Sequence, residues 1–211
     1  QVRLLAELAR GGVGLIVTGH AYVRQDGKCS LGMMGIDRDE RIPGLARLAR
    51  AVHESGPARV VVQLNFGGAN IRPELRVGPL LAPSAREDVP EARAFTEEEA
   101  AQIAECYVRA AERASEAGFD GVQIHGAHGY FINQTLSPLT NRRTDAWGDG
   151  PGGRARMLLE IVAGIRRRLG RGFPLLLKIA SHDGLPDGLQ LADSVQAVRR
   201  AESLGLDAVE V

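Results

Sequence analysis

A repeated unit of a helix, a glycine and a short apolar strand constrains the fold of this chain most strongly. Each helical pattern ends at a glycine, and a run rich in valine, leucine or isoleucine follows. Five such units are visible, with helices expected at residues 2–9, 40–54, 96–117, 154–169 and 191–204 and strands at 13–18, 59–64, 119–125, 175–179 and 206–211. The pattern predicts an α/β fold.

Strict alternation of helices and strands predicts parallel strands joined by right-handed crossovers. A closed barrel of eight such units and an open doubly wound sheet are both built in this way. No G-x-G-x-x-G turn follows any of the strands, so the dinucleotide-binding sheet lacks its most specific sequence feature. Periodicity alone does not decide between the two architectures.

The stretch FDGVQIHGAHGYFINQTLSPLTNRRTD concentrates polar and titratable side chains directly behind an apolar strand. Gly126 and Gly129 interrupt the strand and leave His125, His128 and Tyr130 grouped within six residues. Such a grouping at the end of a strand is typical of a functional site.

A His-x-x-His pair also fits a metal site or a pair of structural histidines. Zinc takes a third and usually a fourth ligand, and neither Cys29 nor Cys106 belongs to a cluster with ligand spacing. We therefore predict no metal site. Two satisfied structural histidines are the alternative that these residues alone leave open.

The segments IHGAHGY and SPLTNRRTD, after a strand of the GFDGV type, resemble the Old Yellow Enzyme family of FMN-dependent NAD(P)H:flavin oxidoreductases. The resemblance implies a (β/α)8 TIM barrel with FMN as cofactor and NAD(P)H as reductant. It also implies that His125 and His128 hydrogen-bond the carbonyl oxygen of an activated alkene, a small-molecule substrate, and that Tyr130 supplies a proton. Hydride addition to such an alkene builds negative charge on oxygen and leaves a carbon that needs a proton, and two imidazoles and a phenol meet that demand.

Polar side chains also come near the carboxyl ends of other strands, where barrel active sites are built. Gln63 and Lys178 occupy such positions, as His125 does. The resemblance implies that Gln63 hydrogen-bonds the flavin edge, that Lys178 lies beside the flavin N1 and O2 region, and that the backbone near Gly19 lines the ring. A glutamine that satisfies a neighbour is the alternative for Gln63, whereas an unpaired lysine on a central strand is costly.

The sequence departs from the family pattern at three places. Where the family often has histidine and arginine after the glutamine, this chain has Phe66 and Ala69. The usual arginine is Lys178, which lacks the bidentate fork of a guanidinium. The segment GDGPGGR lacks the family's polar pair before Arg154. These differences concern substrate range and loop packing more than the class of reaction.

On a TIM barrel the five units correspond to about strands 2 to 6. We expect residues 1–211 to be one partial domain that lacks the first strand and the last two β/α units, because a whole barrel takes ~250 residues. Loops after strands seven and eight commonly hold the phosphate in such barrels. Residues 1–211 alone are therefore expected to be inactive and to bind FMN at least ~100-fold more weakly than a complete barrel.

Composition argues against several classes of partner. The 26 basic residues balance the 26 acidic ones, which gives no electrostatic reason to expect nucleic acid or an anionic membrane. No apolar run approaches the length of a membrane span, and two distant cysteines do not form a disulfide framework, so a cytoplasmic location is expected. Assembly into a homo-oligomer stays open.

Long loops are expected at residues 21–38, 66–95 and 126–153, where they would form the rim of the site. In the last of them, Arg142 and Arg143 are expected to pair with Asp145 or with a neighbouring loop.

Two other functions stay open. One is a barrel fragment without cofactor or catalysis, and the other is a lyase or aldolase in which Lys178 forms a Schiff base.

Overall fold

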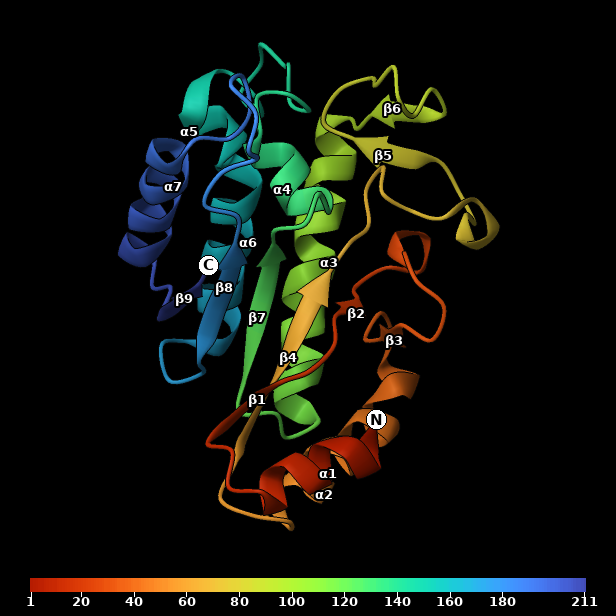
Figure 1. Ribbon diagram of the computed structural model, residues 1–211, viewed down its shortest axis with the longest axis vertical. Helices are drawn as coiled ribbons and strands as arrows, with labels where there is room; N and C mark the ends of the chain where they lie inside the picture. Colours follow the sequence, from red (N-terminus) through yellow and green to blue (C-terminus); the bar gives the residue numbers. More distant parts are fainter.

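The computed structural model describes residues 1–211, along which helices and parallel strands alternate (Figure 1). Three 3-10 turns lie in the connections: η1 (Gln25–Gly27), η2 (Asp39–Arg41) and η3 (Pro73–Leu75). The helices are α1 (Val2–Arg10), α2 (Ile42–His53), α3 (Glu97–Glu116), α4 (Phe131–Leu136), α5 (Gly150–Arg154), α6 (Arg156–Leu169) and α7 (Leu191–Ser203). The strands are β1 (Leu15–Val17), β2 (Ala21–Tyr22), β3 (Met34–Gly35), β4 (Arg59–Asn65), β5 (Leu80–Ala82), β6 (Ala92–Ala94), β7 (Gly121–Gly126), β8 (Leu175–Ile179) and β9 (Ala208–Glu210).

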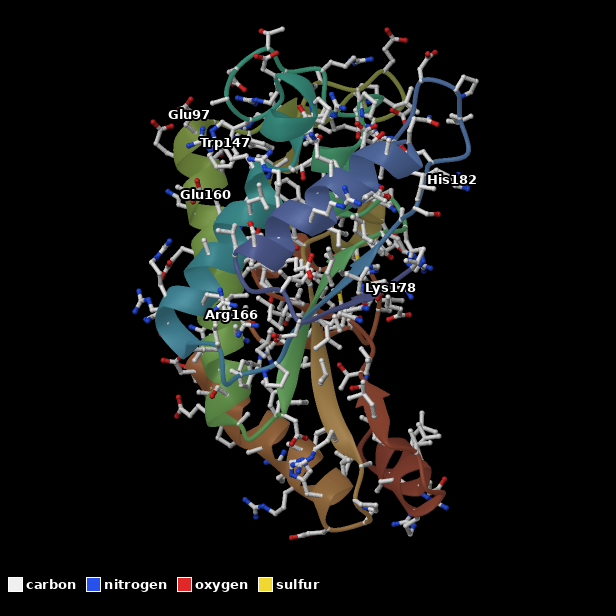
Figure 2. All side chains as sticks on the ribbon, turned by 90° about the vertical axis from the view of Figure 1, so that its left-hand side faces the viewer. Glu97, Trp147, Glu160, Arg166, Lys178 and His182 are labelled. Atoms are coloured by element: carbon white, nitrogen blue, oxygen red, sulfur yellow. The ribbon has the colours of Figure 1, made fainter.

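All strand pairs are parallel, as the alternation predicts. The main sheet has the order β3-β2-β4-β7-β8-β9, and β1 also pairs with β4. Helices α3 and α6 lie side by side along one face of this sheet (Figures 1 and 2). The outer strands β1 and β9 do not pair with each other, so the sheet is open. This architecture is an incomplete (β/α)8 barrel and confirms the expected fold class.

The strands bury alternate side chains against the helices. Val60, Val62, Val122, Ile124 and Leu177 are fully buried and belong to one hydrophobic core that also includes the inner faces of α3 and α6. Because successive side chains of a strand point to opposite faces, the polar residues between them point to the other side of the sheet. That side corresponds to the barrel interior, as expected.

The helix ends follow the predicted signals with one exception. The Thr96 hydroxyl accepts a hydrogen bond from the Glu99 N–H, and the Glu99 carboxylate accepts one from the Thr96 N–H, so α3 begins with a capping box. Gly118 has a φ of 83°, the left-handed conformation expected after a helix. Gly56 does not adopt that conformation; a Cβ there would lie 2.5 Å from the Ala9 carbonyl oxygen, so close packing against α1 requires the glycine.

The three long connections contain more regular structure than the sequence indicates. Within residues 66–95, β5 and β6 form a separate parallel pair, and residues 126–153 contain α4 and part of α5. These elements are only a few residues long, and their helical or strand periods are therefore too short to be recognised from sequence.

Arg143 joins two of these connections. Its guanidinium pairs with Asp145 at 2.5 Å and donates to the Phe95 carbonyl oxygen at 2.8 Å. Arg142 donates to the carbonyl oxygen of Ala85 at 2.7 Å. The structural role expected for these two arginines is therefore correct, and it fixes the rim above the carboxyl ends of the strands.

Candidate active site

The register of the parallel strands brings the polar side chains to one edge of the sheet. Gln63 on β4 lies opposite Gln123 on β7, and His125 on β7 lies opposite Lys178 on β8. Glu210 on β9 lies opposite Lys178. Figure 2 shows Lys178 and His182 on the side away from Trp147 and from Glu160 of α6.

His125 is an almost fully buried imidazole, with 3% of its surface exposed. Burial, together with the neighbouring His20 and His128, lowers the pKa of His125 to about 3. The ring is therefore neutral at physiological pH and carries one N–H donor. Its Nδ1 atom has no hydrogen-bond partner within the chain, which leaves it free for a bound group.

His128 and Tyr130 lie beside His125, as the sequence predicts. The His128 ring centroid is 5.1 Å from that of His125, and the Tyr130 centroid is 5.2 Å from it. Burial raises the pKa of Tyr130 to about 12, with a further contribution from the adjacent Cys29. The phenol therefore keeps its proton at neutral pH and is able to donate it.

His20 is a third imidazole at the site, and the sequence reasoning missed it. It directly follows Gly19, and its ring centroid lies 5.2 Å from Tyr130 and 5.7 Å from His125. Its Nδ1 atom lies 3.1 Å from the Nδ2 atom of Asn65. The available signal was a titratable residue close to the carboxyl end of an apolar strand, which also singled out His125.

The residues expected to contact a flavin are joined by a polar network inside the barrel. Gln63 Nε2 donates to Gln123 Oε1 at 2.6 Å, and Gln123 Nε2 donates to Glu210 Oε2 at 2.9 Å. Lys178 forms an ion pair with the same Glu210 carboxylate, which lowers the pKa of Glu210. Lys178 is thus not the unpaired lysine considered from the sequence, because β9 supplies its counter-charge. Gln63 hydrogen-bonds a neighbouring side chain, Gln123, which was the alternative role considered for it from the sequence. The Gln63 Oε1 atom forms no hydrogen bond within the chain.

Gly19 lies two residues after the end of β1 and next to the start of this network. The Thr18 N–H donates to the Val61 carbonyl oxygen at 2.9 Å, and Thr18 Oγ1 accepts from the Gln63 N–H at 3.3 Å. A Cβ at Gly19 would meet only the Gln1 side chain, at 4.0 Å. The backbone there is accessible and lies at the same sheet edge as Gln63.

The polar groups on the interior face fit a flavin. The interior face offers two buried polar atoms without partners, His125 Nδ1 and Asn65 Oδ1, beside the accessible backbone of Gly19. It also offers a cation at Lys178, although Glu210 balances its charge. No group of three or more His, Cys, Asp or Glu side chains has an arrangement that could hold a metal ion.

Comparison with known proteins identifies the family. The model of the NADH:flavin oxidoreductase / NADH oxidase family matches residues 1–211, the whole of this sequence. The chain belongs to this family. It is therefore part of a group of FMN-dependent NADH and NADPH oxidoreductases of the Old Yellow Enzyme type, as the sequence resemblance indicates.

Curated relatives match almost all of this chain. A metal reductase of Desulforamulus reducens is 38% identical over 209 residues, which cover 96% of this chain and 30% of that protein. An NADPH dehydrogenase of Geobacillus sp. is 38% identical over 206 residues, covering 96% of this chain and 59% of that protein. The chain thus spans between about a third and three fifths of these relatives.

Solved structures show the same fold. An Old Yellow Enzyme homologue from Zymomonas mobilis superposes with a TM-score of 0.88 at 23% identity, covering 99% of this chain and 62% of that one. A 2-naphthoyl-CoA reductase in complex with 2-naphthoyl-CoA also gives 0.88, at 29% identity, covering 98% of this chain and 34% of that one. Separately, none of the helices has the length and apolar character needed to cross a membrane.

Proposed function

We propose that the protein containing this chain reduces the activated C=C bond of α,β-unsaturated carbonyl compounds at the expense of NAD(P)H. The observation that carries this proposal is the convergence of His125, His128 and Tyr130 at the carboxyl end of β7. FMN, when bound, supplies the hydride. Gly19, Gln63 and Lys178 are the residues of this chain that would hold its ring.

The chain's own residues have separate tasks in this reaction. The imidazole N–H groups of His125 and His128 donate to the carbonyl oxygen of the substrate, where negative charge develops as hydride arrives at the β-carbon. Because His125 is neutral, it stabilises that charge as a hydrogen-bond donor without itself titrating at physiological pH. The Tyr130 hydroxyl supplies the proton for the α-carbon.

A Schiff-base mechanism at Lys178 is less well supported. A nucleophilic lysine has to lose its proton, which requires burial away from counter-charges or a second cation nearby. Lys178 instead lies against the Glu210 carboxylate, a counter-charge, and no second cation is part of this network. The 2-naphthoyl-CoA reductase is named for an aromatic thioester, a carbonyl compound conjugated to a ring, which is consistent with the substrate class proposed here.

The experiment that tests the proposal separates flavin content from substrate class. Released FMN is quantified from the purified protein, which is then reduced anaerobically with NADH or NADPH and mixed with 2-cyclohexen-1-one or with the saturated cyclohexanone. We expect the enone to reoxidise the flavin and the saturated ketone to leave it reduced. A protein without flavin would support the non-catalytic alternative, and a reduced flavin that no enone reoxidises would contradict the substrate class.

A further inference from the structure

The turn between β7 and α4 has an unusual backbone. The Tyr130 N–H donates to the Ala127 carbonyl oxygen at 3.3 Å, and the two residues between them, His128 and Gly129, have φ values of 60° and 71°. Two successive positive φ values are the pattern of type I′ turns, which favour glycine, asparagine and aspartate. His128 is the only residue other than glycine with a positive φ in the structure. Other contacts must therefore stabilise this conformation.

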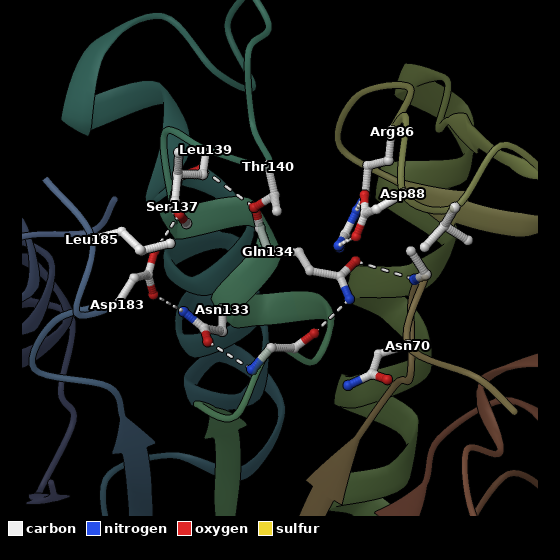
Figure 3. A pocket seen from close by; sticks show the side chains of 13 residues that line it. Asn70, Arg86, Asp88, Asn133, Gln134, Ser137, Leu139, Thr140, Asp183 and Leu185 are labelled. Atoms are coloured by element: carbon white, nitrogen blue, oxygen red, sulfur yellow. Dashed lines mark hydrogen bonds and ion pairs between the residues drawn. The ribbon is translucent and has the colours of Figure 1, made fainter. Parts of the chain in front are cut away.

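Two neighbouring amide side chains supply those contacts. Asn133 Oδ1 accepts the hydrogen bond of the Gly129 N–H at 2.8 Å, and Gln134 Nε2 donates to the Gly129 carbonyl oxygen at 2.7 Å. Both bonds are drawn in Figure 3, where the two side chains reach the turn from the middle of α4. The backbone polar groups of Gly129 are thus both held by side chains.

Gln134 also ties the turn to the connection after β4. Its Oε1 atom accepts from the Ala69 N–H at 3.1 Å, and its Nε2 atom lies 3.3 Å from the Gly67 carbonyl oxygen. The side chain is 1% exposed. A Cβ at Gly68 would lie 2.5 Å from Gln134 Oε1, so the loop closes tightly around the amide.

We propose that Asn133 and Gln134 act as positioning residues for the donor set. They hold the left-handed His128–Gly129 turn, and the turn directs the His128 imidazole and the Tyr130 phenol toward His125. This inference rests on the proposed function, because it assigns the two amides to the substrate-binding donors of that reaction. Without them His128 returns to a negative φ, and the three rings no longer converge.

The first test compares two buried amides in the flavin-loaded protein. Gln134→Met removes the bonds to Gly129 and Ala69 while keeping a side chain of similar length. Asn141→Leu is the matched control, because Asn141 is also buried and donates to the carbonyl oxygens of Thr135 and Trp147 at 2.7 and 2.8 Å, outside the turn. Titration with 4-hydroxybenzaldehyde, followed by flavin absorbance, should show at least tenfold weaker binding for Gln134→Met. Asn141→Leu should bind within twofold of the unsubstituted protein.

A second variant and a second readout keep the inference testable if Gln134→Met folds poorly. Asn133→Leu removes the acceptor of the Gly129 N–H and, with it, the long hydrogen bond from Asn133 Nδ2 to Asp183 Oδ1 at 3.5 Å. In the protein without ligand, hydrogen exchange at the Tyr130 amide should accelerate in both turn variants and not in Asn141→Leu. Unchanged phenol affinity in the turn variants, or an equal loss in Asn141→Leu, would overturn the proposal.

The two proposals fail in different ways. If the unsubstituted protein holds FMN and does not bind the phenol, the proposed function is wrong. The exchange rate of the Tyr130 amide then decides the role of the two amides alone. Faster exchange in Gln134→Met and Asn133→Leu would support it, and unchanged exchange would overturn it.

Discussion

Burial determines the protonation state of the His125 imidazole. An exposed imidazole titrates near neutral pH, whereas the folded chain lowers the pKa of His125 to about 3, first by burial and then through His20 and His128. The unfolded chain therefore binds a proton at this residue between about pH 6.5 and pH 3, where the folded chain does not. Stability must rise with pH across that window and fall on acidification.

The protein without ligand should therefore become less stable as the pH falls. Between pH 7 and pH 5, above the range of the carboxylates, the free energy of unfolding should decrease on acidification, with His125 contributing up to about 1.4 kcal/mol per pH unit. His125→Gln should reduce that dependence, and replacement of the exposed His182 by glutamine should leave it unchanged. Urea unfolding at several pH values measures it. A His125→Gln protein with the full dependence would show that His125 is not buried in its neutral form.

Glu210 is a second residue whose expected effect on a bound flavin depends on a neighbour, through its ion pair with Lys178. Its carboxylate balances the charge of Lys178, so less positive charge is available to stabilise an anionic reduced flavin. Glu210→Gln should raise the midpoint potential of bound FMN. Because the Glu210 side chain is 47% exposed, screening limits the effect to about 1 kcal/mol, or roughly 20 mV for a two-electron couple.

A matched carboxylate provides the control for that measurement. Glu160 pairs with Arg156 on the outer helix α6 and is 45% exposed. Glu160→Gln should leave the potential unchanged in a spectroelectrochemical titration. A lower potential in Glu210→Gln, or equal shifts in both variants, would contradict the assignment of Lys178 to the flavin.

At the scale of elements, the capping box of α3 is the sequence signal with the most direct energetic consequence. Thr96→Ala removes the side-chain acceptor of the Glu99 N–H and should lower the free energy of unfolding by about 1 kcal/mol. Thr144 is exposed and forms no side-chain hydrogen bond, so Thr144→Ala should change it by less than about 0.5 kcal/mol. Denaturant unfolding measures the free energy of unfolding of both variants. Equal changes in Thr96→Ala and Thr144→Ala would mean that the cap does not stabilise the fold.

The sequence predicts long, periodic elements well and short ones poorly. The five helices that carry the barrel were identifiable because each repeats its apolar positions over several turns and ends at a glycine or a cap. The pair β5–β6 and helix α4 were not, since runs of three to six residues do not establish a period. Their conformation is fixed by tertiary contacts such as those of Arg143 with Phe95.

At the scale of the whole molecule, the register of the parallel strands brings the site residues together. His125, His128 and Tyr130 are close in sequence, and their grouping was predictable from one segment. His20, Asn65 and Glu210 come from three other strands or strand ends, and the parallel pairing of β1, β4, β7, β8 and β9 brings them to the same edge. A single sequence holds no direct record of that pairing, which is why the counter-charge of Lys178 was missed.

In the proposed function, this edge of the sheet reduces an activated alkene with Tyr130 as the proton donor. Only the transfer to substrate needs that proton, so Tyr130→Phe should affect one half-reaction and not the other. The phenylalanine ring keeps the packing against His20 and His125 while removing the hydroxyl.

Anaerobic stopped-flow absorbance of the flavin tests this most directly. In Tyr130→Phe, reduction of the flavin by NAD(P)H should proceed within twofold of the unsubstituted rate, whereas reoxidation by 2-cyclohexen-1-one should slow by about 100-fold or more. Equal slowing of both half-reactions, or an unchanged rate of reoxidation, would contradict the account.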